Sequence, residues 1–346
     1  MEIEQLIREN IKRLKPYSCA RDEYEGGTAI FLDANENPYE NGYNRYPDPR
    51  QQKLKKRLAV MKGVLPEQMM LGNGSDEIID LMIRSFCEPA RDNLIVFSPG
   101  YAMYEVSAAV NNVEVRKINL APDFLPDWKE LWCHIDLDTK IIFLCTPNNP
   151  TGKVIPLQQI ERFCRKFAGV VVVDEAYIDF TDEPSAATLL EKCPNVVVLQ
   201  TLSKAWGMAG LRLGICLANM EVIQVLNKVK PPYNISSLTQ NTVIGLLAEE
   251  EEFRQKCDVI KSERKRLLKE LREMGIFSQV CDSEANFILV TSEAFRDIYG
   301  YLLENGIVVR LRDIPPLISG GIRITVGTRE ENDSLLDALR NYYNIG

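Results

Sequence analysis

Histidine is nearly absent from this chain, since His134 is the only one among 346 residues. This scarcity excludes a histidine-rich metal site, and a Ser-His-Asp triad would have to use that single residue. His134 stands between Cys133 and Ile135, next to no further ligand candidate. We interpret it as a partly buried residue on a helix or loop.

Long apolar runs and basic runs are also missing. No apolar stretch approaches the roughly 18 residues that a membrane span needs, and the acidic first residues contain no apolar core of a secretory signal. The formal net charge is -8 and the pI about 5.1, which argues against nucleic-acid binding. We therefore expect neither a membrane nor a nucleic-acid partner.

Paired cysteine spacings are lacking as well. The chain has nine cysteines, an odd number, with no C-x-x-C motif, and several lie in apolar runs. Scattered thiols of this kind are typical of a reduced, cytoplasmic protein.

Lys204 is the most informative residue that is present. It follows the apolar run 196–199 and lies close to Trp206, so it would lose hydration, which favours its neutral amine. A neutral amine can attack an aldehyde and form a Schiff base. Ser203 and Arg212 supply a hydroxyl and a guanidinium that suit a phosphate. Together they indicate pyridoxal 5'-phosphate (PLP), although a lysine after a strand is by itself more often an ordinary surface residue.

A carboxylate should face the ring nitrogen of this cofactor, because PLP withdraws electrons only while that nitrogen stays protonated. Asp174 follows four valines at 170–173, which indicate a strand buried on both faces. It stands at the carboxyl end of that strand, where open α/β sheets bind their ligands. Tyr177 follows and could donate to the ring's phenolate oxygen. An acidic residue in this place could equally be a helix cap or a turn residue.

Three further segments could complete such a site. Asn149 lies in a loop bent by flanking prolines and could present its amide to a ring substituent or a carboxylate. Ser75 is a candidate N-cap of a helix whose free N–H groups would bind phosphate. Tyr101 follows a strand expected at 94–97 and could stack on a pyridine ring. Alone, each could instead be an ordinary turn or core residue.

Strands and helices alternate along the chain, which predicts a mostly parallel sheet covered by helices. Strands are expected at 94–97, 141–145, 170–173, 196–199 and 213–217, with a helix at 157–167. A charged helix at 249–274 resembles a connector into a smaller domain, which would hold strands at 286–290 and 322–326.

With these motifs the chain resembles the fold-type I PLP aminotransferases over nearly its whole length, and within them the histidinol-phosphate aminotransferase family. Asn-Pro-Thr-Gly at 149–152 and Ser203-Lys204 indicate the superfamily. Asn-Arg-Tyr-Pro at 44–47 and Arg-Ile-Thr-Val-Gly-Thr-Arg-Glu-Glu at 323–331 are more specific to the family.

The resemblance implies an α/β fold, with a mostly parallel seven-stranded sheet covered by helices in a large domain and a smaller α+β domain beside it. The implied divisions are an N-terminal arm at 1–40 that packs with the small domain, a large PLP-binding domain at 41–245 and a small C-terminal domain at 246–346.

The resemblance also implies how the cofactor is held. Lys204 would bind PLP covalently and carry the proton, and Asp174 would pair with the pyridine nitrogen. Asn149 and Tyr177 would contact the ring oxygen, and Tyr101 would stack on the ring. The PLP phosphate would be held by Ser75, Asp76, Ser203 and Arg212, and by Tyr46 of the neighbouring subunit in a homodimer.

The implied reaction exchanges an amino group between L-histidinol phosphate and 2-oxoglutarate, in histidine biosynthesis. The amino donor carries a phosphate and no carboxylate, whereas glutamate carries carboxylates, so one anion site must accept both. The residues implied for substrate binding are Tyr17, Asn149, Arg310 and Arg323. How the two arginines divide the anions stays open, and Arg312 has no implied role.

Other activities fit the same cofactor motifs. Cofactor chemistry does not fix side-chain specificity, so an aromatic amino acid aminotransferase and a threonine-phosphate decarboxylase of the same fold remain alternatives. A PLP-dependent DNA-binding regulator is disfavoured, because about 40 residues precede the expected main domain and they show no basic excess.

Overall fold

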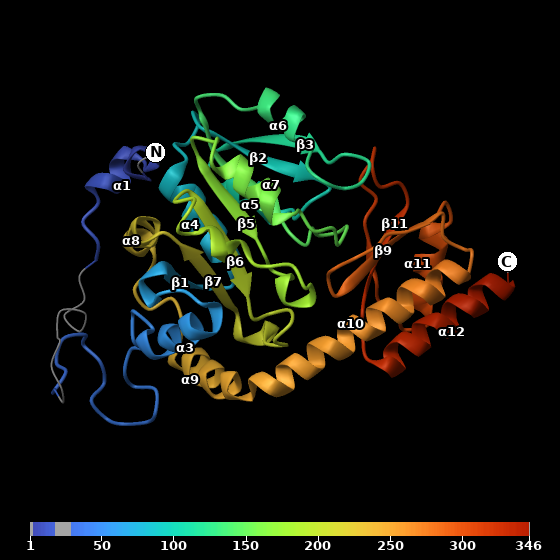
Figure 1. Cartoon of the computed structure of the whole chain (residues 1–346). Coiled ribbons are helices and arrows are strands. Elements are labelled where there is room, and N and C mark those ends of the chain that lie inside the picture. Colours follow the sequence, from blue (N-terminus) through green and yellow to red (C-terminus); the bar gives the residue numbers. More distant parts are fainter. Residues whose placement is uncertain (1–2, 18–28, 346) are drawn as a thin grey trace.

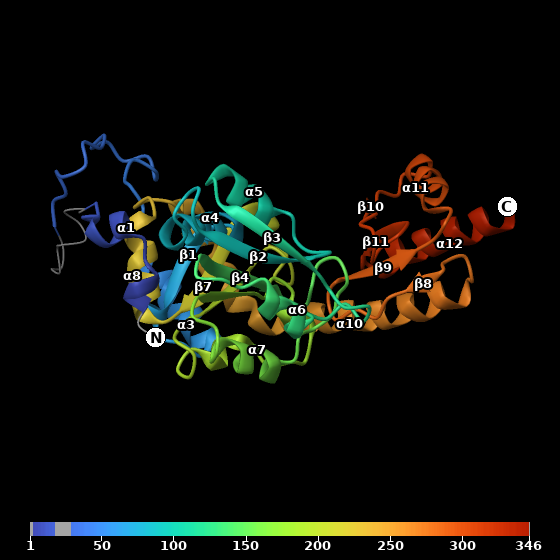
Figure 2. The ribbon, with the colours of Figure 1, turned by 90° about the horizontal axis from the view of Figure 1, so that it is seen from above.

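The computed structural model describes residues 3–17 and 29–345. They form two sheets, each covered by its own helices, and the long helix α10 (Glu250–Glu273) connects the two parts (Figure 1). Viewed from above, the smaller part lies at the opposite end of the molecule from the N-terminal helix α1 (Glu9–Arg13) (Figure 2).

The larger sheet has seven strands in the order β1-β7-β6-β5-β4-β2-β3. All neighbouring pairs are parallel except the two that involve β7, which runs against both β1 and β6. The predicted mostly parallel seven-stranded sheet is therefore confirmed. Its strands are β1 (Met69–Asn73), β2 (Asn93–Ser98), β3 (Glu114–Asn119), β4 (Thr139–Cys145), β5 (Val170–Asp174), β6 (Val196–Thr201) and β7 (Leu213–Ala218).

The valine run of β5 shows why this sheet needs helices on both faces. Val171 and Val173 belong to one hydrophobic core, while Val170 and Val172 belong to the core on the other side. All four are fully buried, as successive side chains of a strand point to opposite faces. One face is covered by α3 (Gln52–Lys62), α6 (Trp128–Cys133), α7 (Leu157–Cys164) and α9 (Ser237–Leu246), the other by α4 (Ser75–Phe86), α5 (Met103–Val110) and α8 (Met220–Val229).

The described start of the N-terminal arm lies against this larger part. Ile3 and Ile11 are buried in the core that contains α4 and α8, and the Arg8 Nε donates to Glu88 Oε2 at 3.2 Å. We expected the arm to pack with the small domain. Ile3, Leu6, Ile7 and Ile11 instead pack against a core of the large domain.

The smaller part has a four-stranded antiparallel sheet in the order β10-β11-β9-β8. Its core lies between this sheet and α10 and the two helices that follow. Buried Glu263 of α10 accepts a hydrogen bond from Asn332 Nδ2 at 2.9 Å and thereby ties two of these helices together. The elements are β8 (Gln279–Val280), β9 (Phe287–Thr291), α11 (Phe295–Glu304), β10 (Arg310–Leu311), β11 (Gly321–Thr325) and α12 (Arg329–Ile345).

The single histidine and the cysteines have no part in a metal site among the described residues. His134 is the C-cap residue of α6 and is partly exposed, as predicted. Cys19 lies outside the described ranges; the other eight cysteines are free, and only Cys133 among them is exposed.

The helices of the described ranges differ from a membrane span in length or in hydropathy. None of them is both long enough and apolar enough to cross a bilayer.

Candidate active site

The carboxyl ends of the parallel strands meet at one edge of the larger sheet, together with the start of the reversed strand β7. Most residues predicted for the site directly follow or precede these strand ends, and they border one cavity of about 200 Å³. The predicted residues at this cavity are Ser75, Asp76, Tyr101, Asn149, Asp174, Tyr177, Ser203, Lys204, Arg212 and Arg323. Ligands of open α/β sheets bind at this edge, so the topology itself assembles the site.

Lys204 projects into the cavity from the loop after β6, and its side chain is reached by solvent. Its Nζ lies 5.8 Å from the centroid of the Tyr177 ring. Partial desolvation, and then the positive charges of Arg323 and Arg212, lower the pKa of Lys204. A lysine with a lowered pKa that solvent can still reach is suited to act as a nucleophile and proton carrier.

Asp174 ends β5 and is buried, with 3% of its surface exposed. The Tyr104 hydroxyl donates to its Oδ2 at 2.6 Å, and the backbone N–H of Ala176 donates to its Oδ1 at 3.0 Å. Burial raises the pKa of Asp174, because the surrounding protein solvates a carboxylate less well than water does. A cationic group placed next to this carboxylate would therefore gain a strong interaction.

Tyr104, which orients Asp174, was not predicted from the sequence. It lies on α5, whereas Tyr101 lies in the loop just before this helix. The two rings meet edge to face with centroids 5.4 Å apart. No periodicity in the sequence connects Tyr104 to the site, because Tyr101 lies outside the helix.

The turn from β1 into α4 forms the end of the cavity predicted to bind phosphate. Gly74, with φ of 77°, is the N-cap residue, and Ser75 is the first residue of the helix instead of its predicted N-cap. A Cβ atom on Gly74 would lie 2.5 Å from Arg212 Nη2, and one on Gly214 would lie 2.4 Å from the Ser75 nitrogen. The two glycines therefore allow an arginine and a neighbouring strand to approach the helix N-terminus.

Asn149 and Arg323 are joined across the cavity. The Arg323 Nη1 donates to Asn149 Oδ1 at 2.6 Å, which leaves the Asn149 amide nitrogen to donate to another group. The Arg323 Nε is buried and has no hydrogen-bond partner. Burial and the charge of Arg310 lower the pKa of Arg323, while Tyr177 opposes this shift.

Arg312, for which the sequence indicated no role, borders the cavity, whereas Arg310 does not. Arg310 is exposed and pairs with Arg323 in the register of β10 and β11. Burial, and then the charges of Arg323 and Arg310, lower the pKa of Arg312. Within the described ranges, none of these three arginines forms an ion pair with a carboxylate, so the cluster would attract an anion.

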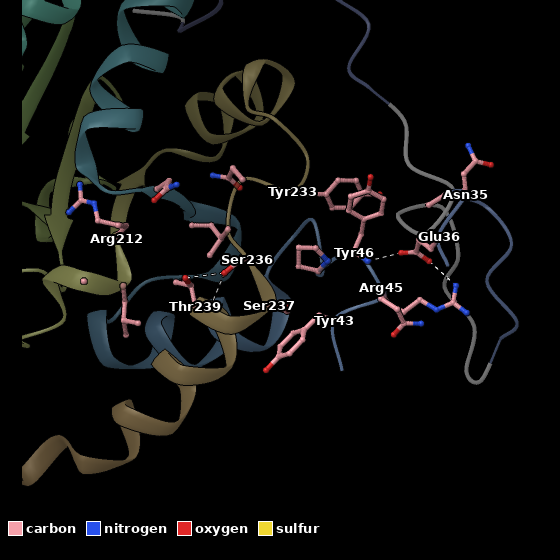
Figure 3. A pocket seen from close by; sticks show the side chains of 18 residues that line it. Asn35, Glu36, Tyr43, Arg45, Tyr46, Arg212, Tyr233, Ser236, Ser237 and Thr239 are labelled. Atoms are coloured by element: carbon pink, nitrogen blue, oxygen red, sulfur yellow. Dashed lines mark hydrogen bonds and ion pairs between the residues drawn. The ribbon is translucent and has the colours of Figure 1, made fainter. Parts of the chain in front are cut away.

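Tyr46 and Tyr17 lie away from this cavity. Tyr46 stacks on Tyr233 of its own chain, with ring centroids 4.4 Å apart, beside a second and larger cavity (Figure 3). Its backbone N–H donates to Glu36 Oε1 at 2.6 Å. Tyr17 is 71% exposed. Neither tyrosine contributes to the site of its own chain, so their predicted roles are untested by this geometry.

The residues present fit PLP. A buried carboxylate with a raised pKa suits a protonated pyridine nitrogen, and Lys204 supplies an amine with a lowered pKa in the same cavity. The first turn of α4 has backbone N–H groups without intrahelical acceptors, and Arg212 Nη2 packs over this turn. A helix N-terminus together with a guanidinium is a suitable phosphate site.

Comparisons with known proteins agree with this geometry. The model of the family "Aminotransferase class I and II" matches residues 25–339. Histidinol-phosphate aminotransferase of Parabacteroides distasonis is 51% identical over 340 residues, covering 98% of this chain and 99% of that protein. The enzyme of the same name from Christiangramia forsetii is 47% identical, with 99% and 98% covered.

Solved structures show the same fold. The histidinol-phosphate aminotransferase of Clostridium acetobutylicum has a TM-score of 0.80 and 26% identity, and covers 87% of this chain and 91% of its own. The enzyme from Sinorhizobium meliloti, solved in complex with pyridoxal-5'-phosphate, also has a TM-score of 0.80 and 26% identity, with 87% and 83% covered.

Proposed function

The chain belongs to the aminotransferase class I and II family, and we propose that it transfers an amino group from L-histidinol phosphate to 2-oxoglutarate, with PLP as its cofactor. The products are imidazole acetol phosphate and L-glutamate, so the reaction serves histidine biosynthesis. Relatives that are 47–51% identical over nearly the whole chain carry the name of this activity.

The observation in the structure that carries the substrate assignment is the arginine cluster. Arg312 and Arg323 border the cavity and Arg310 lies next to them, while no carboxylate of the described residues forms an ion pair with any of the three. Guanidinium groups bind phosphate and carboxylate in the same two-pronged geometry. One cluster can therefore accept the phosphate of the amino donor and the carboxylates of its oxo-acid partner in turn.

PLP, when bound, supplies an electrophilic carbon and an electron sink for the amino group that is transferred. Asp174 would keep a proton on the ring nitrogen, and the Tyr104 hydroxyl holds its carboxylate in place through a 2.6 Å hydrogen bond. Lys204 takes and returns protons at its Nζ, which its lowered pKa favours. Asn149 and Tyr177 would donate to the ring oxygen, and Ser75, Asp76, Ser203 and Arg212 would hold the phosphate; all of them border the cavity.

A substrate screen tests this assignment. Purified enzyme is supplied with 2-oxoglutarate and one of three amino donors: histidinol phosphate, an aromatic amino acid or threonine phosphate. We expect glutamate to form fastest with histidinol phosphate. If glutamate forms fastest from the aromatic donor, the enzyme is an aromatic aminotransferase instead. If threonine phosphate releases carbon dioxide, the enzyme is a decarboxylase.

We further propose that the active unit is a cytoplasmic homodimer with shared sites, in which Tyr46 acts on the partner's cavity. Tyr46 is exposed and lies outside the cavity of its own chain, which is consistent with this role. The large domain would comprise residues 41–245 and the small domain residues 246–346.

The free cysteines support a reducing compartment.

A further inference from the structure

Asn234 lies in the loop between α8 and α9 and reaches the back of the β1–α4 turn. Its amide nitrogen Nδ2 donates to the backbone oxygen of Leu71 at 3.0 Å and to Glu77 Oε2 at 2.9 Å. One side chain thus connects the strand before the phosphate-binding turn to the helix after it, although it is more than 150 residues away in the sequence.

The orientation of this amide is set by Lys230, which is buried with 8% of its surface exposed. The Lys230 Nζ donates to Asn234 Oδ1 at 3.0 Å and to the backbone oxygen of Pro231 at the same distance. An ammonium group can only donate, so the amide oxygen must face it and the amide nitrogen must face Leu71 and Glu77. Asn234 is therefore held in one orientation.

Glu77 transmits this constraint to the turn. The same oxygen, Oε2, that accepts from Asn234 also accepts from the backbone N–H of Asn73. The backbone N–H of Gly74 is likewise taken, because it donates to the Arg212 carbonyl at 2.7 Å. Since these two N–H groups point inward, the first-turn N–H groups of Ser75 and Asp76 are the ones placed to receive a phosphate.

We propose that Asn234 is a positioning residue for the phosphate of the cofactor. It fixes Glu77, and through Glu77 the Asn73 peptide, so that the N-terminus of α4 faces the phosphate. Its amide N–H and the nearby Lys230 ammonium also offset the negative charge of Glu77, which would otherwise repel the phosphate. The inference rests on PLP being the cofactor and is independent of the amino donor.

The test compares two aldehydes that differ only in the phosphate. Full-length apoprotein is titrated with PLP and with pyridoxal, and dissociation constants are measured for the wild type and for Asn234→Ala. We expect the constant for PLP to rise at least about tenfold, as for the loss of one hydrogen bond to a charged group. The constant for pyridoxal should change less than about twofold.

Asn195→Ala is the matched control. Asn195 is also a buried asparagine, and its Nδ2 donates to the backbone oxygens of Cys164, Phe167 and Gly169 at the opposite edge of the sheet. Its loss should lower the melting temperature without changing the ratio of the two dissociation constants. A fall in the affinity for both aldehydes by the same factor in Asn234→Ala would overturn the proposal, because it would indicate a general structural role.

Glu77→Gln provides a second test, which does not depend on whether Asn234→Ala folds. Its amide oxygen can still accept from Asn73 and Asn234, so the preference for PLP over pyridoxal should be kept. Glu77→Leu cannot accept these hydrogen bonds and should lose that preference. Equal preferences in the Gln and Leu variants would contradict the proposed chain of contacts.

Discussion

The surroundings of Lys204 shift its amine toward the neutral form. Among the charges that lower its pKa, Arg323 has the largest effect after partial desolvation. A positive neighbour disfavours the ammonium form, so removing it should raise the pKa of Lys204.

We therefore expect Arg323→Gln to shift the reactivity of Lys204 to higher pH. The measurement is the rate at which trinitrobenzenesulfonate labels Lys204 in the apoprotein, followed by peptide mapping across pH. The midpoint should move upward but stay below that of an ordinary lysine, because desolvation remains. Arg310→Gln is the control, since Arg310 does not border the cavity; an unchanged midpoint in Arg323→Gln would contradict the argument.

The arginine cluster should distinguish phosphorylated from dephosphorylated donors. Arg312→Gln is expected to lower kcat/KM for histidinol phosphate by about 10- to 100-fold, since a hydrogen bond to a charged group contributes about 1.5–3 kcal/mol. Histidinol, which lacks the phosphate, should be affected less. Arg310→Gln should act in the same sense but more weakly, because Arg310 is exposed. Equal losses for both donors would remove Arg312 from phosphate binding.

The sequence predicted the site residues whose position follows directly from a preceding strand. The strand-end positions of Asp174 and Lys204 followed from the apolar runs before them, and both border the cavity. Arg312 could not be chosen over Arg310 from the sequence, because two arginines spaced by one residue point to the same side of a strand. Which of them reaches the cavity depends on where β10 ends, and it ends at Leu311.

Strand β7 and helix α4 meet at a contact that only glycine allows. A Cβ atom on Gly214 would lie 2.4 Å from both the carbonyl carbon of Gly74 and the nitrogen of Ser75, so the backbone would have to move. The contact lies directly behind the phosphate end of the cavity.

Gly214→Ala should therefore weaken PLP binding at least about tenfold and destabilise the protein by about 1–3 kcal/mol, which is typical of overpacking. PLP titration and thermal unfolding measure the two effects. Gly245→Ala in α9 is the control, because its added Cβ would meet nothing within 4 Å. It should leave PLP affinity unchanged and stabilise the helix. Unchanged affinity in Gly214→Ala would show that the turn is not held by this contact.

In the larger sheet, the strands that the sequence predicted are all buried on both faces, such as β5 and β6. The edge strand β3 was missed, because its sequence Glu-Val-Arg-Lys-Ile-Asn is mostly polar. β1 was missed although it too is buried on both faces, because Gly72 interrupts its apolar run and it pairs only with the distant strand β7. Edge position and long-range pairing are properties of the assembled sheet, which local sequence does not show.

At the scale of the whole molecule, Tyr46 should complete the site of a second subunit. Subunit mixing tests this arrangement. Tyr46→Ala and Lys204→Ala homodimers should each be impaired. In a mixed dimer, one site keeps both residues and the other loses both, so activity should recover to about half of the wild-type value for that dimer. Activity equal to the average of the two parents would mean that Tyr46 does not act across the interface.

Borohydride reduction of the enzyme with bound cofactor identifies the lysine that carries PLP. Lys204 in the cavity has a lowered pKa, and so does Lys55 on α3, whose pKa is lowered to about 8 by burial and then by the charge of Lys230. We predict that digestion yields the labelled cofactor on a peptide containing Lys204, and that Lys204→Ala yields no label and loses turnover by several orders of magnitude. Label on the peptide containing Lys55, or on any other lysine, would contradict the assignment of this cavity as the active site.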